Sequence, residues 1–165
     1  MSKVVIFMGS KSDLPKMEPC AQVLKDLGVD FEMTVSSAHR TPARTEELVR
    51  EAEENGCQVI ICAAGMAAHL AGAVAARTVL PVLGVPIDAS PLGGWDSLLS
   101  TVQMPPGFPV GTLALDKAGA KNAGWLAAQI LALDDHNLRE KIINERPNTS
   151  KFRKGQLGHI MLLSA

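Results

Sequence analysis

The sequence lacks several features that would direct it to particular functions. Its 165 residues include no tyrosine, and aromatic residues make up only 4% of the chain, so stacking partners for a flavin are scarce. Sixteen basic residues stand against 17 acidic ones, and the net charge of -1 gives no overall field that would attract nucleic acid or an anionic membrane. We therefore expect no nucleic-acid or membrane partner, and any anionic ligand must be bound by a local site.

Cysteine and metal-site patterns are also sparse. The cysteines, Cys20, Cys57 and Cys62, form no CxxC pair and follow no secretory leader, so we expect reduced, buried thiols in a cytoplasmic protein. No apolar run approaches the roughly 20 residues that are needed to cross a bilayer. His39 and His69 lack the local spacing of a zinc site, and no acidic cluster joins them, which predicts that the protein has no metal site.

What the chain does contain is an alternation of short apolar runs with helical segments. Runs rich in β-branched residues predict strands at 3–8, 31–35, 58–64, 81–86 and 109–115. Start and stop signals, such as Pro15 in a first turn and Gly28 after a last turn, predict helices between these runs and at about 119–133 and 135–146. We expect an α/β fold, a three-layer α/β/α sandwich with a flavodoxin-like parallel sheet of about five strands.

In such sheets, ligands bind beyond the carboxyl ends of the strands, and polar loops leave three of those ends. In the first loop, "GSKSD", Gly9 permits a sharp turn, and Ser10, Ser12 and free N–H groups can face an anion. Asp13 either caps the following helix or accepts hydrogen bonds from sugar hydroxyls. The loop therefore suits a phosphorylated ribose, but a simple capped turn explains it equally well.

The second loop, "SSAHRTP", contains residues that helix initiation does not explain. Thr41 and Pro42 are sufficient to start a helix, whereas Ser37, His39 and Arg40 are not needed for that purpose. Arg40 can make bidentate contacts to a phosphate. His39 would then lie beside the bound anion, where histidine can both give and accept a proton near neutral pH.

The third loop, "AAGMAAHLAG", is built from small residues. Such residues leave backbone N–H groups free to approach a carboxylate closely, and they can line a small, dry cavity. We expect substrate contacts from Gly65, Ala67, His69 and Leu70. His69 lies within the predicted helix at 67–77, so it is as readily interpreted as a core histidine or a donor at the helix terminus.

These loops, together with "LPVLGVP" and "SLLSTVQMPPGFPVGTLA", follow one another in the order of a known family. From about Lys3 to Arg146 the chain resembles the N5-carboxyaminoimidazole ribonucleotide mutase family, the class I phosphoribosylaminoimidazole carboxylase catalytic subunits. The resemblance implies a single α/β catalytic domain at 1–146 that assembles as a homo-octamer. The residues at 147–165 depart from the family pattern and form an atypical C-terminal tail.

The resemblance implies an isomerase of de novo purine (IMP) biosynthesis that moves a carboxylate from N5 of the ribonucleotide to ring C4. It implies no ATP, metal or organic cofactor. The family's contacts to the ribose phosphate fall on Ser10, Asp13 and Arg40, assisted by Ser12 and Ser37. His39 is the implied general acid/base: it would protonate the nitrogen as CO2 leaves and later remove the C4 proton, while the loop at 65–72 retains the transient CO2.

Two alternatives stay open. A carboxylase that uses free CO2 would carry Lys in place of Arg40 and an Arg-Ser-Asn-like run in place of "MAAHL", so Arg40 and His69 favour the mutase. A non-catalytic ribonucleotide-sensing module would bind its ligand through the same loops, and its affinity would survive the loss of His39. Met66 and Ala71 stand where Gly and Pro are common in the family, which alters the stiffness of the loop without removing an implied catalytic group.

Overall fold

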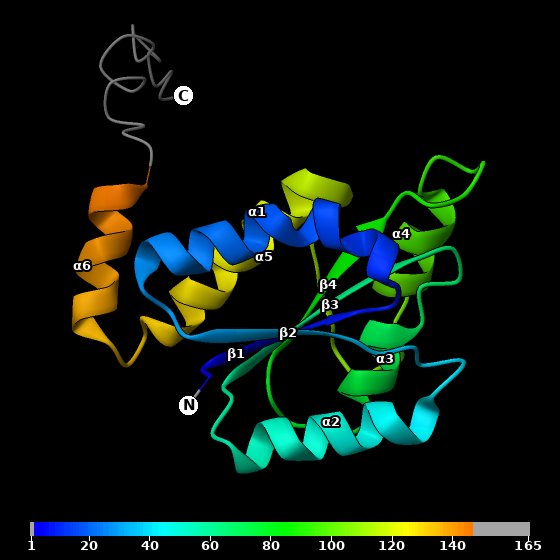
Figure 1. Ribbon diagram of the computed structural model, residues 1–165, viewed down its shortest axis with the longest axis horizontal. Helices are drawn as coiled ribbons and strands as arrows, with labels where there is room; N and C mark the ends of the chain where they lie inside the picture. The colour runs from blue at the N-terminus through cyan, green and yellow to red at the C-terminus, as the bar shows by residue number, and fades with distance from the viewer. Residues whose placement is uncertain (1, 147–165) are drawn as a thin grey trace, which may run out of the picture.

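The computed structural model describes residues 2–146, so the predicted tail at 147–165 lies outside the described residues. One parallel sheet runs through the molecule (Figure 1). Its strands are β1 (Val4–Met8), β2 (Phe31–Val35), β3 (Val59–Gly65), β4 (Val82–Ile87) and β5 (Gly111–Thr112). They pair in the order β2-β1-β3-β4-β5, which confirms the expected flavodoxin-like arrangement of five strands.

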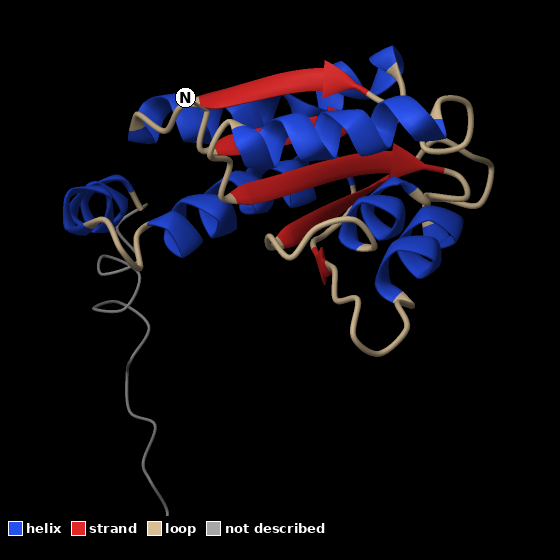
Figure 2. Ribbon diagram, turned by 90° about the horizontal axis from the view of Figure 1, so that it is seen from below, coloured by secondary structure: helices blue, strands red, loops and turns tan. Residues whose placement is uncertain are grey.

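Helices cover both faces of this sheet, as Figure 2 shows from a second direction. They are η1 (Lys11–Asp13), α1 (Leu14–Leu27), α2 (Pro42–Glu54), α3 (Leu70–Ala75), α4 (Trp95–Val102), α5 (Asp116–Leu131) and α6 (His136–Glu145). Helices α1, α5 and α6 pack on one face, and α2 and α3 pack on the other. The three-layer sandwich is therefore confirmed.

The alternation of side chains along β1 explains why its sequence is a continuous apolar run. Val4, Ile6 and Met8 join the core beneath α1 and α5, while Val5 and Phe7 join the core over α2 and α3. All five residues of the strand are buried, because helices cover both faces. Within residues 2–146, no helix is long and apolar enough to cross a bilayer.

Two predicted elements are shorter than expected. The strand predicted at 109–115 is regular only at Gly111–Thr112, because β5 is an edge strand that pairs with β4 alone. The helix predicted at 67–77 covers only Leu70–Ala75, so placing His69 inside a helix was wrong. His69 occupies the position immediately before α3, at the carboxyl edge of the sheet, where its side chain is free to face the neighbouring loops.

Candidate functional site

The loops that follow β1, β2 and β3 converge on a cavity of about 620 Å³ at the carboxyl edge of the sheet. These strands are neighbours in the sheet, so their carboxyl ends lie side by side. Every residue that we expected at the site lines this one cavity: Gly9, Ser10, Ser12, Asp13, Ser37, His39, Arg40, Gly65, Ala67, His69 and Leu70. The topology therefore brings together side chains that lie up to about 60 positions apart in the sequence.

The first loop is a closed hydrogen-bonded turn. The backbone N–H of Ser10 donates to Asp13 Oδ2 at 3.0 Å, and Ser12 donates to Ser10 Oγ through its backbone N–H at 3.3 Å and through its hydroxyl at 2.9 Å. Asp13 occupies the predicted N-cap position of α1, but its side chain makes no capping hydrogen bond to that helix. Its backbone is already helical, and its carboxylate turns back to Ser10.

The sequence predicted that the conformational freedom of Gly9 permits a sharp turn, but the structure does not make use of that freedom. Gly9 is not among the residues with positive φ, and a Cβ placed there would lie 3.5 Å from its nearest neighbour, Ala64 Cβ, which is ordinary contact. The backbone therefore does not need glycine at this position for conformational freedom.

Arg40 connects the second loop to the first. Its Nε donates to Ser37 Oγ at 3.2 Å, and its Nη2 donates to the Gly9 carbonyl at 3.5 Å. Among residues 2–146, the guanidinium forms no salt bridge with a carboxylate. Its positive charge is thus directed toward the "GSKSD" turn without being neutralised, and this arrangement can bind an anion between the two loops.

The two histidines of the site contact each other. His69 Nδ1 lies 3.2 Å from His39 Nε2, and the ring centroids are 5.1 Å apart. One of these nitrogens donates the bond and the other accepts it, so the proton position on one ring fixes the tautomer of the other. A pair of this kind can donate a proton at one step and accept it at another. The local sequence gave no sign of the contact, since the residues belong to different loops.

The sequence did not predict a further group of interacting residues, Lys16, Asp88 and Asp116. Lys16 Nζ lies 2.9 Å from Asp116 Oδ1 and donates to the Asp88 carbonyl at 2.5 Å, while the Asp88 N–H donates to Asp116 Oδ1 at 2.9 Å. These contacts join the start of α5 to the loop after β4, which contributes Ala89 to the cavity lining. The sequence could have indicated this loop, because the loop after the fourth strand leaves the same end of the sheet as the three loops that were considered.

Known proteins resemble this chain over most of its length. The sequence model described as AIR carboxylase matches residues 3–151. The chain belongs to the AIR carboxylase family. It is 54% identical over 151 residues to the N5-carboxyaminoimidazole ribonucleotide mutase of Pyrococcus abyssi, covering 92% of this chain and 86% of that protein. The protein of the same name from Escherichia coli is 49% identical over 160 residues, covering 97% of this chain and 90% of that protein.

Solved structures agree with the AIR carboxylase family assignment. The crystal structure of a variant of Treponema denticola PurE2 superposes with a TM-score of 0.81 at 26% identity, covering 94% of this chain and 98% of that one. The crystal structure of Treponema denticola PurE gives a TM-score of 0.78 at 25% identity, with the same coverage.

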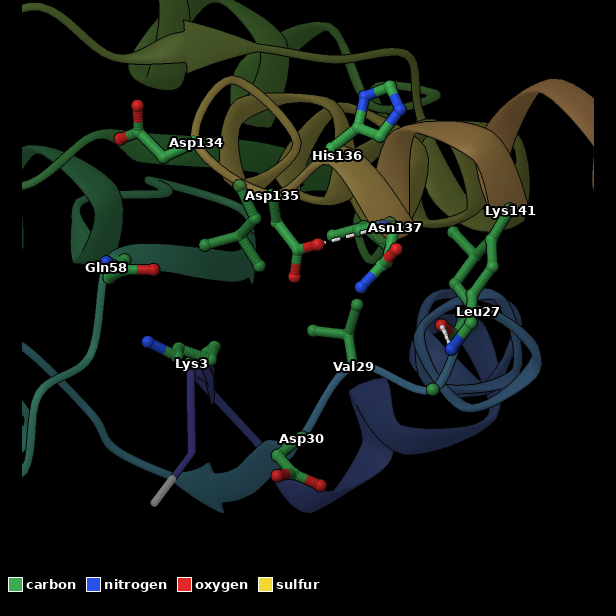
Figure 3. Close-up of a pocket in the computed structure, with 13 residues that line it drawn as sticks. Lys3, Leu27, Val29, Asp30, Gln58, Asp134, Asp135, His136, Asn137 and Lys141 are labelled. Atoms are coloured by element: carbon green, nitrogen blue, oxygen red, sulfur yellow. Dashed lines mark hydrogen bonds between the residues drawn. The ribbon is translucent and has the colours of Figure 1, made fainter.

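A second cavity, of about 610 Å³, lies at the other end of the strands, beside the residues that precede β1, β2 and β3 (Figure 3). Asp135 and Lys141 line it, but each already has a structural partner. Asp135 Oδ1 accepts the N–H of Leu138 at the start of α6, and Lys141 Nζ donates to the Leu27 carbonyl. Within residues 2–146, no group of three or more His, Cys, Asp or Glu side chains is placed to bind a metal ion, and the absence of a metal stays a prediction.

The replacement Asp13→Asn tests the electrostatics of the "GSKSD" turn. Burial raises the pKa of the Asp13 carboxyl above its ordinary value of 3.8, although the Ser10 N–H and the Ser12 hydroxyl oppose the shift. Between 3.8 and the raised pKa, the folded protein retains a proton that the unfolded chain has released, so the free energy of unfolding falls as the pH rises through this window. Asparagine can still accept the Ser10 bond without the buried charge.

We therefore expect the free energy of unfolding of Asp13→Asn at pH 7 to equal or exceed that of the wild type. The rise in this free energy that the wild type shows as the pH falls toward 3.8 should be absent from the variant. Urea unfolding at several pH values between 4 and 8 measures both properties. A loss of more than about 1 kcal/mol at pH 7 would mean that the charge itself stabilises the turn.

Proposed function

We propose that this AIR carboxylase family member is an N5-carboxyaminoimidazole ribonucleotide mutase of de novo purine biosynthesis. It would convert its substrate to 4-carboxyaminoimidazole ribonucleotide by moving the carboxylate from N5 to C4. The observation that carries the proposal is the convergence on one cavity of a buried Asp13, the His39–His69 pair and Arg40, which has no carboxylate partner among residues 2–146. The names of the relatives at about 50% identity support the same reaction.

Each part of the substrate has a suitable partner in the cavity. The phosphate would bind between the Arg40 guanidinium and the hydroxyl groups of Ser10 and Ser12, assisted by Ser37, which already positions Arg40. A ribose hydroxyl would donate to the carboxylate of Asp13. The aminoimidazole ring would then lie toward the histidine pair and the small residues Gly65 and Ala67.

The reaction would proceed in two balanced steps. In the first, the bond between N5 and the carboxylate carbon breaks, CO2 forms, and His39 gives a proton to the nitrogen left behind. In the second, ring C4 attacks the retained CO2, a carbon–carbon bond forms, and neutral His39 removes the C4 proton. The proton that His39 gives up is thus recovered, so the net change is an isomerisation. We expect that it uses no ATP, metal or organic cofactor.

We also propose that the chain assembles into a homo-octamer in the cytoplasm. The exposed side chains of Trp95, Leu99 and Val102 lie at helical spacing on one face of α4, and Trp95 is 66% exposed. In the same helix Asp96 Oδ1 is buried without a hydrogen-bond partner among the described residues, and a second subunit can supply a donor. Light scattering is expected to give the mass of eight chains, and a monomer at micromolar concentration would contradict the assembly.

The reaction is tested by offering the purified protein two substrates in the presence of EDTA and without ATP. We expect rapid formation of the 4-carboxy product from N5-carboxyaminoimidazole ribonucleotide, and slow formation from aminoimidazole ribonucleotide at low bicarbonate. The reverse preference would assign the chain as a carboxylase that uses free CO2. Binding of both nucleotides without product from either would assign it as a ribonucleotide sensor.

A further inference from the structure

A pair of opposite charges, Lys16 and Asp116, lies beside the Asp13 carboxyl group. Asp13 has helical backbone angles and α1 begins at the next residue, so Lys16 follows it by three positions on the same face of the helix. Asp116 is the first residue of α5, and its Oδ1 lies 2.9 Å from Lys16 Nζ. Two elements that are distant in the sequence thus bring one positive and one negative charge to the "GSKSD" turn.

The position of the Lys16 ammonium group is fixed by several contacts. Asp116 has a φ of 54°, in the left-handed region that aspartate adopts more readily than most residues, and its Oδ1 also accepts the Asp88 N–H at 2.9 Å. Lys16 Nζ donates to the Asp88 carbonyl at 2.5 Å. The side chains of Lys16 and Asp116 are 29% and 32% exposed, so water screens their charges only in part.

Both charges act on the ionisation of Asp13. Burial is the main reason that the pKa of the Asp13 carboxyl is raised; Lys16 opposes this shift, Asp116 adds to it, and Lys16 has the larger effect. Among residues 2–146, these are the charged side chains that shift the pKa of Asp13. The other charged or titratable side chains on the surrounding elements are Lys11, His39, Arg40, His69 and Asp88.

We propose that Lys16 is a positioning residue of the nucleotide site: held by Asp116, its charge keeps Asp13 as a charged acceptor for a ribose hydroxyl. This inference rests on the proposed function and adds two residues to the site. Asp13 Oδ2 accepts the Ser10 N–H at 3.0 Å, whereas Oδ1 meets the Ser12 hydroxyl at 3.5 Å, a long contact that leaves it able to accept another donor. A charged acceptor forms the stronger hydrogen bond. Lys16 does not line the cavity and acts through Asp13.

The test measures nucleotide affinity against pH in charge variants. Calorimetry gives the Kd of 4-carboxyaminoimidazole ribonucleotide from about pH 5 to pH 8 for the wild type, Lys16→Met, Asp116→Asn and the double variant. Methionine retains an unbranched side chain, and asparagine tolerates positive φ and can still accept the Asp88 N–H. Lys25→Met, at the exposed far end of α1, is the matched control. Thermal unfolding is recorded for all five proteins.

The two single variants should change the affinity in opposite directions. In the wild type, affinity should fall toward acid pH as Asp13 takes up a proton. Lys16→Met leaves the negative charge of Asp116 beside Asp13 without its cation, so this fall should begin at a higher pH, and affinity in acid should be several-fold weaker. Asp116→Asn leaves the positive charge uncompensated, so the fall should begin at a lower pH. The double variant should lie between them, and Lys25→Met should match the wild type.

These opposite shifts separate the proposed role from a purely structural one. The ligand titrates in the same way in every experiment, so it does not alter the differences between proteins. A contact that merely supports the fold would weaken binding in both single variants by a factor that does not depend on pH, and that result would overturn the role of Lys16. Identical pH profiles in all five proteins would also overturn it and leave the mutase function intact. Absence of binding by the wild type at every pH would overturn both.

Discussion

Replacing His39 with asparagine is expected to lower kcat by about 10²–10⁴-fold, the usual contribution of a general acid/base. The first step of the proposed reaction takes a proton from His39 and the second step returns one to it, and asparagine can neither supply nor accept a proton at neutral pH. Asparagine does not reach the position of His39 Nε2, so the variant also loses the 3.2 Å contact with His69 Nδ1, and thermal unfolding is recorded to show that the fold is kept. Stopped assays analysed by chromatography measure kcat, and calorimetry with the product measures affinity.

The matched control for His39→Asn is the equivalent replacement at His69. If His69 acts by fixing the tautomer of His39, then His69→Asn should lower kcat less than His39→Asn, and it should change the pH dependence of kcat. Product affinity should stay near that of the wild type in both variants. Full activity in His39→Asn would remove the acid/base role from the "SSAHRTP" loop, whatever the affinity.

A second large effect is expected from Gly119→Ala at the start of α5. In an exposed helix this change normally stabilises a protein by roughly 1 kcal/mol. Here a Cβ would lie only 1.6 Å from the Ala114 carbonyl oxygen and 2.5 Å from its carbon, so the backbone that leads into α5 must move. We expect a loss of about 3 kcal/mol or more in the free energy of unfolding, measured by urea titration.

The effect of Gly119→Ala should extend to the site. The displaced segment includes Asp116, which accepts bonds from Lys16 and from the Asp88 N–H and thereby fixes the loop that carries Ala89. Gly72→Ala in α3 is the control, since its Cβ would meet chiefly the flexible Met104 side chain, with Sδ at 3.1 Å. Its stability should lie within about 1 kcal/mol of the wild type. Equal losses in the two variants would show that the close approach at Gly119 is not what destabilises the fold.

The sheet order and the general position of the site could be predicted because they depend on periodic signals. Continuous apolar runs such as Val4–Met8 identify strands buried on both faces, and their alternation with helices predicts a parallel sheet with right-handed crossovers. The rule that ligands bind at the carboxyl ends selected residues from three separate loops, and all of them line one cavity. The same rule, applied to the loop after β4, would have added Ala89.

Features that depend on tertiary distances could not be predicted in this way. The contact between His39 and His69 joins two loops 30 positions apart in the sequence, so no local pattern encodes it, and the start of α3 at Leu70 was also not predicted. The turn of Asp13 toward Ser10 competes with the usual preference for a side-chain cap on the following helix, and the positive φ of Met66 is a backbone feature that no sequence pattern predicted. The histidine contact and the turn of Asp13 decide the chemistry proposed for the cavity.

The most direct test of this account is a crystal structure of the protein with 4-carboxyaminoimidazole ribonucleotide bound. The account predicts the nucleotide at the carboxyl edge of the sheet, with its phosphate on Arg40 and a ribose hydroxyl on Asp13. It also predicts that the imidazole ring lies within hydrogen-bond reach of His39, about 2.6–3.2 Å. A nucleotide in the cavity of Figure 3, or a phosphate placed away from Arg40, would contradict it.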